Sequence, residues 1–202
     1  VGFSSIREFQ SLRESLSEAT SCLAHRGPDD SGLFFDERYG VGLGHRRLSV
    51  IDLSKAGQQP MSSDDGSVQI AYNGEIYNFR EIRGTLEKKG HGFKSTTDTE
   101  VILKSYIQWG IKCLQRFVGM FSLAIWDSQK EELYLSRDRL GIKPLFYYAR
   151  DKNILFASEL KAILAFKGTK NLDLDSIPLF LHYQYVPAPK TIFKNIFKLL
   201  PG

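Results

Sequence analysis

Residues 71–78 read Ala71-Tyr72-Asn73-Gly74-Glu75-Ile76-Tyr77-Asn78, and they follow a run of strand-forming residues that begins at Ser67. Asn-Gly pairs readily adopt positive φ, so this pair predicts a sharp turn where the strand ends. The turn would present a side-chain amide, a glycine N–H and a carboxylate in consecutive residues. Two neutral donors can hold a carbonyl oxygen that becomes an oxyanion, with Glu75 facing a substrate ammonium group. An ordinary hairpin or strand-to-helix turn is the simpler interpretation of these residues alone.

Two helices are expected after this stretch. Asn78 is a candidate N-cap, with Glu81 as its capping-box partner, for a helix that ends near Lys89. A second helix, Glu100–Gln108, follows an N-cap at Thr97 or Asp98. Capping alone would explain an acid at position 98. Gly90 and Gly110 are expected to end the two helices.

The second half of the chain predicts a series of β-hairpins. Met120–Trp126 is apolar at almost every position, as is typical of a strand covered on both faces. Doubly covered strands imply several layers, so we expect an α+β fold of two packed antiparallel sheets between helices. The other expected strands are 1–3, 33–36, 41–47, 132–136, 144–149 and 154–157, and the other expected helices are 8–23, 159–166 and 176–185.

Two charged segments have two interpretations each, and a third has one. Arg47 is either a surface residue with a packed stem or a clamp for a carboxylate. The loop Ala24–Gly32, rich in His, Arg and Asp, is either a solvated turn or a buried scaffold beside a site. The loop Arg137–Pro144 is by default a salt-bridged surface turn.

Composition excludes several classes of protein. The 202 residues are 42% hydrophobic and 25% charged with a net charge of +4, which is typical of one large soluble globular domain. No basic block indicates a nucleic-acid partner, and no apolar run indicates a membrane span. The two cysteines, Cys22 and Cys113, form no CxxC motif, which argues against a disulfide framework or a metal site and favours a reducing cytoplasm.

Six motifs in order across the chain resemble the glutaminase domain of asparagine synthetases, which are class II (N-terminal nucleophile) glutamine amidotransferases. Each motif alone is weak, whereas six in this order are specific. The motifs are residues 25–32, 44–52, 72–78, 97–100, 136–145 and 156–159.

The resemblance implies a four-layer αββα fold and hydrolysis of the glutamine side-chain amide to glutamate and ammonia. The family's nucleophile is an N-terminal cysteine, which would stand three residues before Val1. We therefore expect the chain as written to bind glutamine without hydrolysing it. Neither Cys22 nor Cys113 matches that nucleophile.

The resemblance also assigns the site residues. Asn73, through its side chain, and Gly74, through its N–H, would form the oxyanion hole. Glu75 and Asp98 would bind the α-ammonium group of glutamine. The α-carboxylate and the rest of the pocket would be held by Arg47, Leu48, Ser49, Val50 and Ile51.

Domain organisation follows from the same resemblance. Residues 1–185 would form the glutaminase domain, and residues 186–202 would be a linker, without a packing element of its own, to a missing synthetase domain. That domain would use ATP and Mg to amidate aspartate, whereas the glutaminase domain needs no cofactor. A homodimer is an open assembly. An amidotransferase with another acceptor and a non-catalytic glutamine-binding module are the alternative functions.

Overall fold

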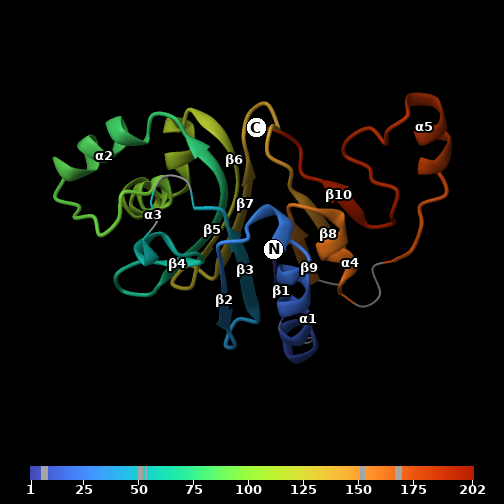
Figure 1. Cartoon of the computed structure of the whole chain (residues 1–202), viewed down its shortest axis with the longest axis horizontal. Helices are drawn as coiled ribbons and strands as arrows, with labels where there is room; N and C mark the ends of the chain where they lie inside the picture. Colours follow the sequence, from blue (N-terminus) through green and yellow to red (C-terminus); the bar gives the residue numbers. More distant parts are fainter. Residues whose placement is uncertain (6–8, 50–51, 53, 151–152, 167–169) are drawn as a thin grey trace.

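A computed structural model describes residues 1–202 except 6–8, 50–51, 53, 151–152 and 167–169. In the described part, all the strands belong to two antiparallel sheets, one of order β10-β8-β9-β1-β3-β2 and one of order β4-β5-β6-β7 (Figure 1). The strands are β1 (Gly2–Ser4), β2 (Asp30–Asp36), β3 (Val41–Arg47), β4 (Met61–Ser62), β5 (Val68–Ile76), β6 (Gly119–Asp127), β7 (Glu132–Arg137), β8 (Phe146–Arg150), β9 (Asn153–Ala157) and β10 (Ile196–Lys198).

Helices cover the outer face of each sheet. Figure 1 shows α2 and α3 beside the four-stranded sheet, α1 and α4 beside the six-stranded sheet, and α5 apart from both. The α-helices are α1 (Phe9–Ser21), α2 (Phe79–Glu87), α3 (Asp98–Trp109), α4 (Leu160–Leu164) and α5 (Ser176–Tyr183), and 3₁₀ turns occupy Ala24–Arg26, Lys55–Gly57 and Gly110–Arg116.

Three apolar clusters separate the four layers. Successive residues of a strand face opposite sides of its sheet, so one strand can supply two clusters. In β9, Leu155 packs toward α1 and α4, while Phe156 packs toward the other sheet. In β6, Leu123 packs toward α2 and α3, while Trp126 joins the cluster between the sheets. The expected α+β architecture of two helix-covered sheets is confirmed.

The turn predicted at Asn73-Gly74 is wrong. Strand β5 continues through both residues to Ile76, and Gly74 is not among the residues with positive φ. A side chain is excluded there for another reason: a Cβ on Gly74 would lie 2.2 Å from the carbonyl oxygen of Met120 on β6. Glycine is therefore required by the close approach of two strands and not by a turn.

The capping box predicted at Asn78 is also wrong. Asn78 precedes α2, but its side chain makes no cap hydrogen bond. Its amide instead donates to the carbonyl of Arg116 and accepts from the N–H of Val118, at 3.0 Å each. The helix ends at 90 and 110 and the cap at Thr97 agree with the sequence, since both glycines have positive φ and Thr97 accepts from the N–H of Glu100.

The prediction that residues 186–202 lack a packing element of their own is wrong. Strand β10 pairs with β8 at the edge of the larger sheet, and Ile196 is buried in the core beneath α1 and α4. The adjoining loop at 137–144 is not a simple surface turn, because Asp138 is 1% exposed and accepts four backbone N–H groups. Arg137 links the loop to the C-terminal segment by donating to the carbonyl of Leu199.

No helix in the described ranges has the length and apolar composition that crossing a membrane requires.

Candidate functional site

A cavity of about 540 Å³ opens beside the ends of β1, β3 and β5 and the start of α3. Six of the residues assigned from the sequence line it: Arg47, Leu48, Asn73, Gly74, Glu75 and Asp98. Ser49 does not line it. Its N–H donates to the carboxylate of Asp29 at 2.7 Å, so it holds the neighbouring 24–32 loop instead. Val50 and Ile51 lie outside the described residues.

Asn73 presents an unpaired amide to this cavity. Its position in β5 has the same parity as Ala71, which packs between the sheets, so its side chain points to that side of the sheet. The Nδ2 atom is buried and has no hydrogen-bond partner in the described part of the chain. A buried donor without a partner costs free energy, so its retention favours a role toward a ligand.

The backbone N–H of Gly74 points away from β6, toward the edge of β5 that borders the cavity. The N–H of Tyr77 donates to Val118, so the odd-numbered residues of β5 are the ones that bond to β6. The even-numbered residues point away from β6, as Tyr72 and Ile76 show by donating to Gln59 and Asp98. The N–H of Gly74 lies between these two donors, and β4 pairs only as far along β5 as Ile70. It is therefore a second donor available to the cavity.

Asp98 is a buried carboxylate at the N-terminus of α3. Its Oδ2 accepts from the hydroxyl of Tyr72 at 2.6 Å and from the N–H of Ile76 at 3.0 Å, and the residue is 5% exposed. Burial raises the pKa of this carboxyl, and the two hydrogen bonds oppose that rise. A cation beside Asp98 would offset the cost of burying its charge.

Arg47 lies at the end of β3, 7% exposed, with its guanidinium on the cavity. It donates through Nη1 to the carbonyl of Ser54 at 2.8 Å and through Nη2 to the carbonyl of Asp52. A Cβ on Gly57 would lie 2.2 Å from Nη2, so glycine leaves room for the guanidinium. These carbonyls orient the planar group without neutralising it, which suits a clamp for an anion.

Two further predicted residues are more open to solvent. Glu75 and Leu48 both line the cavity, and both are exposed. The structure therefore brings Arg47, Asn73, Gly74, Glu75 and Asp98 to a single cavity, with opposite charges at different positions on its wall.

His45 is a cavity residue that the sequence analysis did not single out. Its Nε2 lies 2.9 Å from the carbonyl of Tyr72, which can only accept, so Nε2 carries the proton. Burial lowers the pKa of the imidazole to about 4, so the ring is neutral at pH 7. The Nδ1 acceptor is buried and has no partner among the described residues.

Tyr72 and Gln59 were also missed. The Gln59 amide accepts from the N–H of Tyr72 at 2.7 Å and donates to the hydroxyl of Thr99 at 3.2 Å, which ties β5 to α3. The sequence analysis names Tyr72 only as part of the stretch around Asn73 and assigns it no role. Its position directly before the Asn-Gly pair was the available signal, but only the fold reveals its contact with Asp98.

The loop at 24–32 is a scaffold beside the cavity. Glu159 accepts from Arg26 at 2.9 Å and contacts His25 at 3.0 Å. Arg46 donates through Nε to the carbonyl of Gly27 at 2.8 Å. Burial would raise the pKa of the Glu159 carboxyl, but the contacts with Arg26 and His25 outweigh burial and lower it. The hydrogen bonds favour the scaffold interpretation of this loop, but it is not buried as that interpretation expected, because His25, Pro28 and Asp29 are exposed.

The described residues include no group of three or more His, Cys, Asp or Glu side chains arranged to hold a metal ion. Cys113 lies in the core between the four-stranded sheet and its helices, as expected, where burial raises the pKa of its thiol to about 12. Neither Cys113 nor Cys22 lines the cavity.

Comparison with known sequences gives one consistent family. Residues 1–202 match the glutamine amidotransferase domain. The putative asparagine synthetase (glutamine-hydrolyzing) 2 of Methanocaldococcus jannaschii is 40% identical over 93% of this chain and 40% of its own length. Asparagine synthetase (glutamine-hydrolyzing) 1 of Bacillus subtilis is 39% identical over 94% of this chain and 29% of its own length. Amidase chry2 of Gibberella zeae is 34% identical over 94% of this chain and 28% of its own length.

Comparison with solved structures supports the fold. The allosteric regulatory enzyme of purine biosynthesis aligns with a TM-score of 0.63 and 21% identity over 82% of this chain and 42% of that chain. Glutamine phosphoribosylpyrophosphate amidotransferase from Bacillus subtilis aligns with a TM-score of 0.54 and 24% identity over 63% of this chain and 30% of that chain. The chain spans less than half the length of the curated relatives named here. It belongs to the glutamine amidotransferase domain family and is homologous to the glutamine-hydrolysing asparagine synthetases.

Proposed function

We propose that this chain is the glutaminase domain of a glutamine-dependent asparagine synthetase. The observation that carries the proposal is the unpaired Nδ2 of Asn73 beside the outward N–H of Gly74 on the cavity wall. Two preorganised neutral donors are what a developing oxyanion requires, and removing one typically costs about 3–4 kcal/mol of transition-state stabilisation.

The charges around the cavity suit the two ends of an amino acid. Arg47 would bind the α-carboxylate through the guanidinium N–H groups that the two carbonyl anchors do not use. Asp98 and Glu75 would bind the α-ammonium group. Because burial already raises the pKa of Asp98, an ammonium ligand would stabilise the ionised form and compensate its desolvation.

The register of β1 supports a nucleophile placed before Val1. Gly2 pairs with Leu43, and the N-terminal amino group of Val1 donates to the carbonyl of Gly44. If β1 continued in the same register, the third residue before Val1 would lie opposite Arg47. A cysteine there would reach the cavity that Val1, Asn73 and Gly74 line.

The chemistry then proceeds in two steps. The cysteine sulfur bonds to the side-chain amide carbon of glutamine, and the oxyanion is held by Asn73 and Gly74. The C–N bond breaks, and the nitrogen leaves as ammonia with the proton taken from the thiol through the α-amino group. Water then attacks the thioester and releases glutamate and the free thiol.

A direct test is release of ammonia and glutamate from glutamine by the chain extended with Cys-Gly-Ile before Val1. The matched control carries Ala-Gly-Ile. Activity in the cysteine form alone supports the proposal. Inactivity of both forms, with glutamine bound, would favour a non-catalytic module, and absence of binding would contradict a glutamine site altogether.

The acceptor of the ammonia is a further part of the proposal. Asparagine synthetases among the relatives favour aspartate, activated by ATP and Mg in a domain that residues 186–202 would connect to residues 1–185. The similarity to amidase chry2 favours the second candidate, an amidotransferase with another acceptor. Formation of asparagine from glutamine, aspartate and ATP by the full-length protein would separate them. A cytoplasmic location and a homodimer stay predictions.

A further inference from the structure

We infer that Asp52 is a positioning residue that orients both charged ends of the cavity, the Arg47 guanidinium and the N-terminus of α3 with Asp98. This inference rests on the proposed function, because it concerns how the same cavity holds an amino acid. Asp52 itself lines the cavity.

The side chain of Asp52 holds the segment that precedes α3. Its Oδ2 accepts from the N–H of Thr96 at 3.0 Å and from the hydroxyl of Thr96 at 3.1 Å. Thr97 follows directly and caps α3 by accepting from the N–H of Glu100 at 3.2 Å. Asp98 is the first residue of that helix. The Asp52 carboxylate is therefore bonded two residues before the carboxylate that would bind the ammonium group.

The backbone of Asp52 holds the other end. Its carbonyl accepts from Nη2 of Arg47, and the carbonyl of Ser54 accepts from Nη1 at 2.8 Å. The Oδ1 of Asp52 accepts from the N–H of Ser54 at 2.8 Å, which fixes both carbonyls relative to each other. One residue thus sets the orientation of the guanidinium with its main chain and the start of α3 with its side chain.

The carboxylate is ionised at neutral pH. Hydrogen bonds from Ser54 and Thr96 hold the pKa of Asp52 well below its usual range. All three donors to its two oxygens would lose their acceptor in an alanine variant. An asparagine side chain has one carbonyl oxygen, so it can accept hydrogen bonds from either Ser54 or Thr96, and the other residue loses its acceptor.

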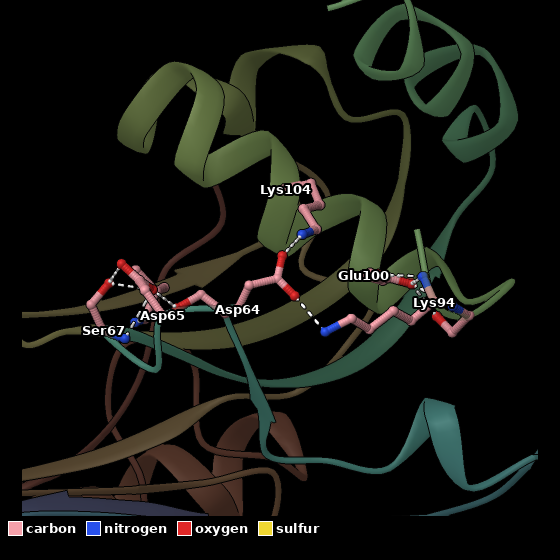
Figure 2. A network of polar contacts seen from close by, with 9 residues as sticks. Asp64, Asp65, Ser67, Lys94, Glu100 and Lys104 are labelled. Atoms are coloured by element: carbon pink, nitrogen blue, oxygen red, sulfur yellow. Dashed lines mark hydrogen bonds and ion pairs between the residues drawn. The ribbon is translucent and has the colours of Figure 1, made fainter. Parts of the chain in front are cut away.

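Asp64 provides a control for general loosening of this region (Figure 2). Asp64 accepts from Nζ of Lys94 at 2.6 Å and from Nζ of Lys104, so it also ties the segment before α3 to the body of the domain. Glu100 accepts from the N–H of Lys94 at 2.9 Å. Asp64 does not line the cavity and has no described contact with Arg47.

The test is titration of the 202-residue chain with three ligands, because binding needs no nucleophile. L-glutamine carries both charged ends, 4-aminobutanamide lacks the α-carboxylate, and 4-carbamoylbutanoic acid lacks the α-ammonium group. The proteins are the unmodified chain, Asp52→Ala, Asp52→Asn and Asp64→Asn. Thermal melting of each variant shows whether it is folded, and Thr96→Val replaces Asp52→Ala if that variant does not fold.

Orientation of both charged ends by Asp52 predicts a distinct pattern of dissociation constants. Asp52→Ala should weaken L-glutamine about tenfold and each one-ended analogue about threefold, since losses at separate ends add as free energies. Asp52→Asn should be intermediate, and Asp64→Asn should leave all three constants unchanged. Weakening of one analogue only, no change in Asp52→Ala, or an equal effect of Asp64→Asn would overturn the inference. Failure of the unmodified chain to bind L-glutamine would instead refute the proposed function.

Discussion

Removing the hydroxyl of Tyr72 should destabilise the protein in a way that depends on pH. The Tyr72→Phe substitution deletes the 2.6 Å hydrogen bond to Oδ2 of Asp98 and leaves the N–H of Ile76 as the one described donor to that oxygen. Both residues are buried, so water does not readily replace the hydroxyl. A hydrogen bond to a charged group contributes about 1.5–3 kcal/mol, against about 0.5–1.5 kcal/mol for a neutral pair. The free energy of unfolding should therefore fall by about 2 kcal/mol at pH 7.

The pH dependence follows from the direction of the Asp98 shift. Its pKa in the folded protein is above the usual 3.8, so the folded state binds more protons than the unfolded state between the two values. Stability then decreases as pH rises from 3.8 through the folded-state pKa. Tyr72→Phe raises the folded-state pKa further, because the ionised carboxylate loses one of its hydrogen-bond donors. The deficit of the variant should be full at pH 7 and shrink to about 1 kcal/mol or less below pH 3.8.

Urea denaturation between about pH 3 and pH 7, followed by tryptophan fluorescence, measures this deficit. Trp126 is buried between the sheets and reports unfolding of the core. Tyr106→Phe is a matched control, because its hydroxyl bonds to Asp127 at 2.8 Å while Lys130 and backbone N–H groups also bond to that carboxylate. Its deficit should vary less with pH. A Tyr72→Phe deficit that is constant or grows toward acid would refute the reasoning.

Three further outcomes are expected. Gly74→Ala should lower the free energy of unfolding by about 1–3 kcal/mol in urea denaturation, because its Cβ would lie 2.2 Å from the Met120 carbonyl oxygen. The control Gly84→Ala in α2 places a Cβ that meets no atom within 4 Å, so it should not destabilise the protein. Asp98→Ala should weaken glutamine about tenfold or more in calorimetric titration, and an unchanged affinity would remove Asp98 from the site. Asp138→Ala should cost about 3 kcal/mol at pH 7 by leaving buried N–H groups unpaired. Burial would raise the pKa of Asp138, but the backbone N–H groups outweigh burial and lower it. The contribution of Asp138 to the free energy of unfolding is therefore present above pH 3.8 and is lost as pH falls. A deficit that persists unchanged in acid would contradict this.

The layered fold could be predicted because most of its strands carry a recognisable sequence pattern. The apolar run of Met120–Trp126 requires cover on both faces, and β6 indeed contributes to the cores on both sides of its sheet. Helix ends were also readable, since Gly90 and Gly110 adopt positive φ as their positions suggested. These features depend on a few neighbouring residues.

Features that depend on long-range contacts were missed or misjudged. The Asn73-Gly74 pair has the sequence of a turn, but pairing with β6 holds it in a strand, so tertiary structure overrides local preference. Strand β10 gains its place from pairing with β8, which lies far from it in the sequence. The contacts of Tyr72 with Asp98 and of Asp52 with Thr96 join residues 26 and 44 positions apart. Motifs predicted residues that the fold brings to one cavity, and only the fold shows what orients them.

The central claim is that Asn73 stabilises an oxyanion, and the kinetics of Asn73→Ala test it most directly. In the chain extended with Cys-Gly-Ile, ammonia release and glutamine affinity are measured for Asn73→Ala and for Asn78→Ala. The Asn78 control removes an amide that contacts Arg116 and Val118. The account predicts that Asn73→Ala lowers kcat by about 10²–10³-fold while the dissociation constant of glutamine changes little. A loss confined to glutamine affinity, with kcat preserved, would contradict the account.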